Sequence, residues 1–473
     1  PQRLDRRSLL IHLAPYEGVF SPPDCRAVVV GRMRRNATAK HVFIDVVRRR
    51  FLSLDELEAA RRSPPYGRLM AFLQALAVAG ESFFLATGQK TILVDGGYSS
   101  TTLVKALTAP HLDVVICTHG DSDHARGLRD LLAQTGAPTV GEFWLPGQWA
   151  DHIEPLLKDP QGFVERLGDE IYDLLAERRD FDFSRPFEDQ LIPDVDGQDD
   201  GTPDVTDQDG SWSDAAPVDP DPAWWRTLVN EVNTQPLPEP TWTTPPAPVS
   251  DQTEQLSDEQ QQQLAAVVAD AIDTAKLIYE IAVQAAKNRV PVRWFDFQAF
   301  ADGQAPRGGW PGVLEPLNAC ELVTPPKPAS ASLARYIALS RINRHSLVFH
   351  ALETNSSPSV LFCGDSPLKG GRKTAWPGFR QKPTRGFAAT APHHGRASNA
   401  GAYAIAEGWR PGGRIFWVRA GGGAKVPCNE LKGQWRSCTS CAHVSLRSVD
   451  LRPAHDPTYG WWSCTGLCSW NCC

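Results

Sequence analysis

The stretch from residue 114 to residue 124 constrains this chain more than any other. Val114–Cys117 is an uninterrupted apolar run, which predicts a short buried strand. A helical pattern begins near Ala125 and continues through Leu132. Between them lies a loop with two histidines and two aspartates, namely His119, Asp121, Asp123 and His124. Because rigid elements flank it, the loop can hold these polar groups at a fixed site.

Imidazole and carboxylate groups together suit a divalent cation such as zinc, manganese or iron. A simpler interpretation is that Asp121 and Asp123 complement the positive end of the following helix. That interpretation leaves His119 and His124 unexplained. We therefore favour a metal site.

Four motifs, taken in order, resemble those of the metallo-β-lactamase superfamily. Thr118–His124 resembles the metal motif H-x-H-x-D-H, with Asp121 in place of the second histidine. The others are Thr91–Gly97, an early strand ending in an Asp-Gly loop, Leu361–Asp365, a strand ending in an aspartate, and Pro392–Ser398, a late histidine motif. The Asp121 variant is similar to the branch containing the hydrolase domain of competence DNA-uptake proteins.

This resemblance implies an α/β fold, the four-layer αββα sandwich, and two divalent metal ions, zinc or manganese. His119, Asp121 and one of His393 and His394 would hold one ion, and the other late histidine would join Asp123 and His124 at the second. Asp365 would bridge the two ions. The expected catalytic residues are Asp123, His124 and Asp365.

Four further residues are expected around the ligands. Asp95 ends a strand of the predicted hairpin 80–95, which turns at Gly88, and it braces the metal loop or serves as a simple turn aspartate. Where many family members carry a third histidine, this chain offers Asn343 or His345, or neither. Ser398 could bind an oxyanion or cap the next helix.

Five regions are predicted: a basic N-terminal extension (1–66), two halves of the hydrolase domain (67–179 and 254–427), an acidic linker (180–253) and a cysteine-rich tail (428–473). The linker is rich in Asp, Gly and Pro, which predicts disorder because it buries little apolar surface. Its Trp224-Trp225 pair could dock it onto the body.

After the linker, Ser257 and Gln260 form a predicted capping box. It opens a long helix with one apolar face, most simply core against a sheet. The helix ends before Pro291.

The tail contains seven of the 11 cysteines. Cys438 and Cys441 form a C-x-x-C pair, and Cys464 and Cys468 follow, so a structural zinc site is one prediction and a reduced, poorly ordered tail is the other. A disulfide scaffold is not expected, and we predict a cytoplasmic protein.

The formal charge of −7 does not favour general nucleic-acid binding, and no run is long enough to span a membrane. We expect a hydrolase that uses a metal-bound hydroxide. Asp121 replaces an imidazole ligand with a carboxylate, which shifts the metal preference from zinc toward manganese or magnesium. Such a two-metal site favours a phosphodiester substrate, either nucleic acid or a nucleotide. We therefore expect nuclease or phosphodiesterase activity. The alternatives are hydrolysis of a carbon ester, thioester or lactam, and a non-catalytic interaction module that recruits protein partners through the linker or tail.

Overall fold

A computed structural model of the chain describes residues 41–45, 50–53, 71–177, 181–182, 187–191, 222–234, 240–244, 257–323, 332–369, 376, 378–409, 413–422, 427–441 and 445–463. The chain divides into two units, residues 1–68 and 69–473. In the first unit, the described residues form an antiparallel hairpin of β1 (His41–Asp45) and β2 (Arg50–Ser53).

The second unit contains a nine-stranded mixed sheet. Its strands, in spatial order, are β10 (Cys320–Glu321), β8 (Val292–Asp296), β7 (Thr139–Pro146), β6 (His111–Ile116), β5 (Thr91–Val94), β4 (Phe83–Ala86), β3 (Phe72–Ala75), β16 (Val449–Pro453) and β17 (Trp461–Ser463). Strands β5 to β8 are parallel, so their carboxyl ends share one edge. The antiparallel pair β4–β5 confirms the predicted hairpin, which turns at Gly88 with a φ of 87°.

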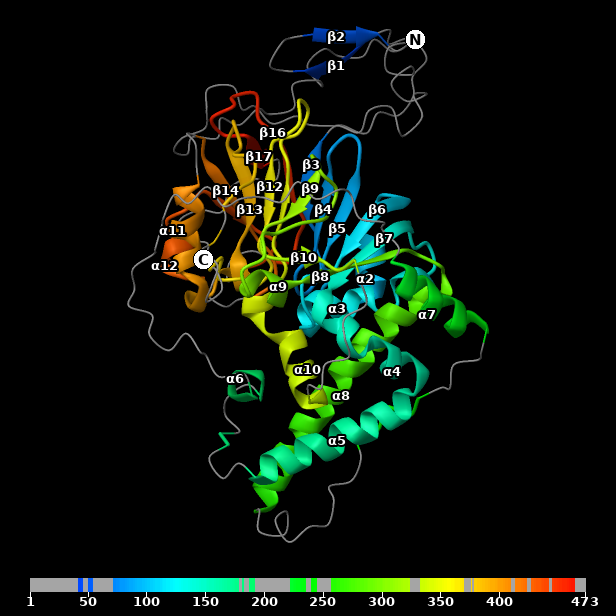
Figure 1. Cartoon of the computed structure of the whole chain (residues 1–473). Coiled ribbons are helices and arrows are strands. Elements are labelled where there is room, and N and C mark those ends of the chain that lie inside the picture. Colours follow the sequence, from blue (N-terminus) through cyan, green and yellow to red (C-terminus); the bar gives the residue numbers. More distant parts are fainter. Residues whose placement is uncertain are drawn as a thin grey trace, which may run out of the picture. The chain divides into compact units, whose positions relative to one another are not determined.

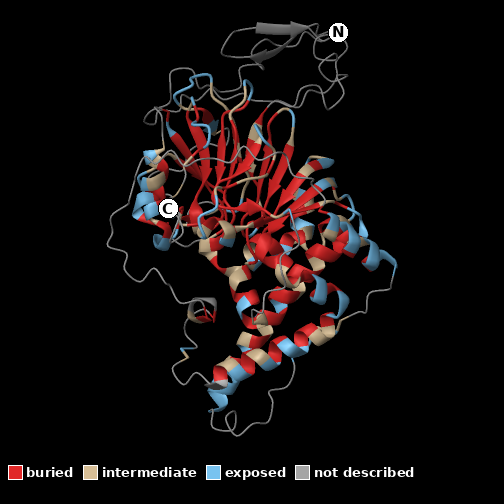
Figure 2. Ribbon diagram, viewed as in Figure 1, coloured by how far each residue is buried: buried red, intermediate tan, exposed pale blue. Residues whose placement is uncertain are grey.

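A six-stranded mixed sheet lies opposite the first. Its strands, in order, are β15 (Arg436–Cys438), β14 (Ile415–Arg419), β13 (Phe387–Thr390), β12 (Val360–Phe362), β11 (Phe349–Ala351) and β9 (Leu314–Pro316). One apolar cluster fills the space between the sheets, with Phe83, Ile92 and Val114 from one and Phe349 and Phe362 from the other. The inner faces are therefore the buried centre of the unit (Figure 2).

Helices cover the outer face of each sheet (Figure 1). Those beside the larger sheet include α2 (Ser100–Ala106), α3 (Ser122–Ala125), α4 (Ile153–Lys158), α5 (Pro160–Glu177), α7 (Ala223–Thr234), α8 (Asp258–Lys287) and α10 (Leu333–Arg341). Those beside the smaller sheet are α11 (Gly401–Gly408) and α12 (Asn429–Lys432), and the structure also describes the short helices α6 (Phe187–Leu191) and α9 (Phe297–Ala301). The order helix, sheet, sheet, helix confirms the predicted fold class.

Helix α8 begins as the sequence predicts. Ser257 accepts a hydrogen bond from the Gln260 backbone, and the Gln260 side chain accepts one from the Ser257 backbone, which completes the capping box. Its apolar face packs mainly against α4, α5, α7 and α10 instead of directly on a sheet. The helix predicted from Ala125 is replaced by short turns, α3 followed by 3₁₀ segments at 126–128 and 131–133.

Two predicted regions need correction where the structure describes them. Helix α7 lies inside the predicted disordered linker, and its Trp225 is fully buried against Trp294 with ring centroids 5.4 Å apart. The tail also begins as part of the fold: β15 extends the smaller sheet, and β16 and β17 extend the larger one. These strands were missed because each is short, and its apolar partners come from distant segments.

Candidate metal centre

Asp95 fixes the metal loop from the end of β5. One of its carboxylate oxygens accepts a hydrogen bond from the Thr118 backbone and the other from the Thr118 hydroxyl, both at 2.8 Å. The second oxygen also lies 2.8 Å from Nδ1 of His124. Such a contact fixes the imidazole so that Nε2 faces the site, as carboxylate partners of metal-binding histidines do. Asp95 thus makes the bracing contacts expected of it.

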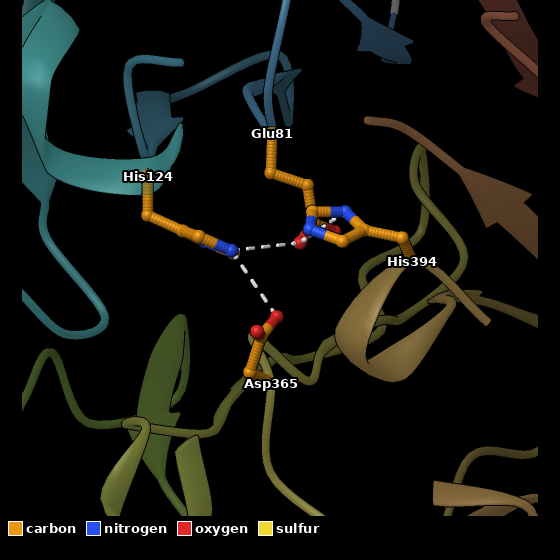
Figure 3. A group of neighbouring side chains, drawn as sticks. All are labelled: Glu81, His124, Asp365 and His394. Atoms are coloured by element: carbon orange, nitrogen blue, oxygen red, sulfur yellow. Dashed lines mark ion pairs between the residues drawn. The ribbon is translucent and has the colours of Figure 1, made fainter. Parts of the chain in front are cut away.

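Figure 3 shows four buried side chains from distant parts of the chain pointing toward one another: Glu81, His124, Asp365 and His394. Nε2 of His124 lies 3.1 Å from Oδ1 of Asp365 and 3.3 Å from Oε2 of Glu81. Asp123 completes this group, because its Oδ2 lies 2.8 Å from Nε2 of His394. The group could hold one divalent cation.

A second group consists of His119, Asp121 and Asp365. Nε2 of His119 lies 3.6 Å from Oδ2 of Asp121 and 3.8 Å from Oδ2 of Asp365. Asp365 therefore faces both groups, with Oδ1 toward one and Oδ2 toward the other. This is the arrangement that a bridging carboxylate requires.

The two late histidines, His393 and His394, have different neighbours. His394 lies with Asp123, as described above, whereas Nε2 of His393 lies 3.8 Å from Oδ2 of Asp365, the oxygen that faces His119. Both histidines have left-handed backbone conformations, with φ values of 48° and 54°. Residues with side chains adopt this conformation at a cost, and such strain gathers at functional sites. His394 therefore belongs to the first group, whereas His393 lies near Asp365 but outside both groups of facing ligands.

Arg419, which the sequence analysis did not single out, supports that turn. It is 1% exposed, and its Nε donates to the His394 carbonyl at 2.7 Å. Its Nη1 donates to the carbonyl of Ser440, inside the Cys438–Cys441 loop, at 2.8 Å. Nδ1 of His394 lies 3.0 Å from the carbonyl of Ala420. This contact leaves Nε2 to face the site.

The charges of this cluster are suited to cations. Glu81 Oε1 and Oε2, His119 Nε2, His124 Nε2 and Asp365 Oδ1 have no hydrogen-bond partner among the described residues, although all are buried. Buried polar atoms are normally paired, and an unpaired group marks a missing ion or a functional role. Zinc and manganese both accept imidazole nitrogen and carboxylate oxygen, so the residues fit a metal.

The pKa values indicate the same shortage of positive charge. Burial raises the pKa of Glu81 to about 8, although His124 and His394 oppose the shift. Burial lowers the pKa of His394, but its hydrogen bond with Asp123 and the charge of Glu81 outweigh this and raise it to about 9. Bound protons thus offset the negative charge of the carboxylates, and metal cations could offset the same charge instead.

The other predicted residues divide between the site and the core. Nδ2 of Asn343 lies 3.4 Å from Nδ1 of His393, and with its amide rotated it donates to Asp121 at 3.2 Å. Oγ of Ser398 also lies 3.4 Å from Nδ1 of His393. His345 belongs to neither group and stacks on Phe297, with ring centroids 4.3 Å apart. Burial lowers the pKa of His345 to about 3, which fits a neutral core residue.

Glu81 is the carboxylate that the sequence analysis missed. It follows Gly80, whose backbone has a φ of 87° and packs closely against the loop, since a Cβ there would lie 2.3 Å from the Asp123 carbonyl. The backbone N–H of Glu81 donates to that carbonyl at 2.8 Å. The available signal was a charged residue two positions before a strand whose four residues are all buried.

Comparison with known families supports this geometry. Residues 77–252 match the model of the metallo-beta-lactamase superfamily. The chain carries a metallo-beta-lactamase superfamily domain. The matched range contains Glu81, Asp95 and the metal loop, whereas Asp365 and the late histidines of this metallo-beta-lactamase fold lie beyond it. No curated protein matches the chain.

Among the described helices, none combines the length and apolar character needed to cross a bilayer. The family match and the buried ligand groups together identify a domain with a metallo-beta-lactamase fold and a candidate buried metal site.

Proposed function

We propose that this protein is a metal-dependent hydrolase of phosphodiester bonds in nucleic acid or nucleotides. One observation carries the proposal: four carboxylates, Glu81, Asp121, Asp123 and Asp365, surround the histidines of the two groups. Two divalent cations would match their four negative charges. Oxygen-rich sites favour harder cations such as manganese or magnesium over zinc. Paired hard cations suit displacement at phosphorus.

When bound, two such cations would polarise a phosphoryl oxygen and lower the pKa of water toward neutrality. The chain supplies the positioning. Asp95 orients His124, and Asp365 faces both groups. The Asp123 side chain is 20% exposed, so it reaches solvent and can orient a water molecule by a hydrogen bond. No serine or cysteine nucleophile is needed.

The likeness of Thr118–His124 to the competence DNA-uptake branch supports the same substrate class. The near-complete set of facing ligands argues against a non-catalytic interaction module. Carbon esters, thioesters and lactams are the competing substrates, since the fold by itself does not select a substrate. Cytoplasmic location, protein partners recruited through the linker or tail, and a tail zinc site also remain proposals.

The test is hydrolysis of bis(p-nitrophenyl) phosphate by protein loaded with manganese, loaded with zinc, or treated with a chelator. A carbon ester, a thioester and a β-lactam serve as comparison substrates under the same conditions. We expect manganese-dependent cleavage of the diester that the chelator abolishes. Cleavage of only a comparison substrate would overturn the phosphodiester proposal while leaving the metal centre intact.

A further inference from the structure

A pocket lies on the outer side of the metal loop, beside the candidate centre. Gly120 and Ser122, which flank Asp121, form part of its lining. The rest comes from the 3₁₀ segment η2 (Arg126–Leu128) and the turn after it, from α8 and from α10. Asp121 lies between the metal centre and the pocket. Its Oδ2 lies 3.6 Å from Nε2 of His119, whereas its Oδ1 lies 3.4 Å from Nε of Arg341 in the pocket wall.

Positive charge predominates in this lining. Four cations, Arg126, Arg129, Lys276 and Arg341, converge there, whereas the acidic lining residues are Asp270 and Asp273. The lining therefore has a formal charge of +2, from four positive and two negative groups. Cations brought together in a recess repel one another, and this repulsion is relieved when an anion binds among them.

The four cations are not equally compensated. Arg341 forms ion pairs with both Asp121 and Asp270, so it is held in place at the boundary with the metal centre. Arg129 pairs with Asp130 at 3.4 Å and with Glu280 at 3.5 Å, whereas Arg126 reaches Asp273 only at 4.0 Å. Lys276 forms no salt bridge with any residue that the structure describes. Lys276 and Arg126 are thus the cations most available to a ligand.

We propose that this pocket binds a second phosphate group of the substrate, one that is not cleaved. The proposal rests on the proposed phosphodiesterase function. Arginine matches phosphate oxygens with its planar fork and lysine supplies a compact charge. Because Lys276 belongs to α8, the helix after the predicted linker, this helix would select substrates that carry a further phosphate near the scissile bond.

The test uses two dinucleotides that differ only in one terminal phosphate, placed at the 5′ end in one series and the 3′ end in another. In the manganese-loaded wild type, we expect the extra phosphate at one end to lower KM about tenfold. In Lys276→Ala and Arg126→Ala, this advantage should fall to less than threefold, with kcat on bis(p-nitrophenyl) phosphate unchanged. Lys287→Ala, an exposed position on the same helix outside the pocket, is the matched control and should keep the full advantage.

Salt dependence gives a second readout. Removal of one cation that binds a phosphate should reduce the slope of log affinity against log salt by about 0.7 for a single strand. An unchanged phosphate advantage in both pocket variants would overturn the proposal, as would an equal decrease in Lys287→Ala. If the wild type cleaves neither dinucleotide, calorimetric binding of the phosphorylated dinucleotide decides: weaker binding by Lys276→Ala than by Lys287→Ala supports the pocket, and equal binding rejects it.

Discussion

Arg293 on β8 and Asp365 after β12 are both buried charged residues, but their surroundings differ. Two nitrogens of Arg293 donate to the two oxygens of Glu321 at 2.7 and 2.6 Å, and a further bond reaches the Gly309 carbonyl. Glu321 also accepts from the Gly309 backbone. Around Asp365, by contrast, several buried oxygens and nitrogens lack hydrogen-bond partners among the described residues.

This difference distinguishes a structural cluster from a functional one. A bidentate pair with two further backbone hydrogen bonds offsets much of its own desolvation cost. A cluster with excess carboxylates is stable only when protons or cations supply the missing charge. We therefore expect substitutions near Asp365 to change metal binding and turnover, and substitutions near Arg293 to change stability alone.

The largest effect is expected for Asp123→Asn. The change keeps the size of the side chain but removes the charge that faces His394 and can secure a cation. Turnover of bis(p-nitrophenyl) phosphate should fall by about two to four orders of magnitude, the usual scale for lost acid–base or electrostatic assistance. Circular dichroism should show an intact fold, because the residue lies near the loop surface. Wild-type activity in this variant would remove the basis for the metal mechanism.

Glu321→Gln tests the structural cluster. It leaves Arg293 buried without its bidentate partner, which should lower the free energy of unfolding by about 3–5 kcal/mol in a denaturant titration. Metal content of the folded protein should not change. The control is Glu154→Gln, which removes an exposed pair with Lys158 and should cost less than about 1 kcal/mol. Equal costs for the two variants would contradict the comparison.

Glu81→Gln should have opposite effects with and without metal. The metal-free protein loses a buried carboxylate whose pKa is raised by burial, so its melting temperature should rise or stay the same. Metal affinity should fall about tenfold or more, because an oxygen donor loses its charge. Differential scanning calorimetry with and without manganese measures both. A variant that binds manganese as tightly as wild type would show that Glu81 is not part of the centre.

The smallest effect is expected for Cys438→Ser, which tests the predicted tail zinc site. Cys438 and Cys441 are buried, whereas Cys464 and Cys468 lie outside the described residues. Metal analysis should show the loss of one equivalent of zinc, with a modestly lower melting temperature because β15 still pairs with β14. Unchanged zinc content and melting temperature would leave only the alternative of a tail without metal.

The elements whose signals are local could be predicted from the amino-acid sequence. The run from Val114 to Cys117, the turn at Gly88 and the capping box at Ser257 each depend on neighbouring residues. The same is true of the dense histidine and aspartate loop, which contributes His119, Asp121 and His124 to the two groups. Such features are encoded within one strand, turn or helix start, so a short window of sequence is sufficient.

Contacts between distant residues could not be predicted in this way, because they depend on how the two sheets pack. Glu81 joins His394 because β4 lies in one sheet, β13 and β14 lie in the other, and the two sheets face each other. The separation of His393 from His394 depends on two left-handed backbone conformations supported by Arg419. The tail strands β15 and β16 likewise form by pairing with β14 and β3 at the edges of the two sheets. Sheet pairing and backbone turns of this kind depend on contacts between remote segments, which no local pattern in the sequence specifies.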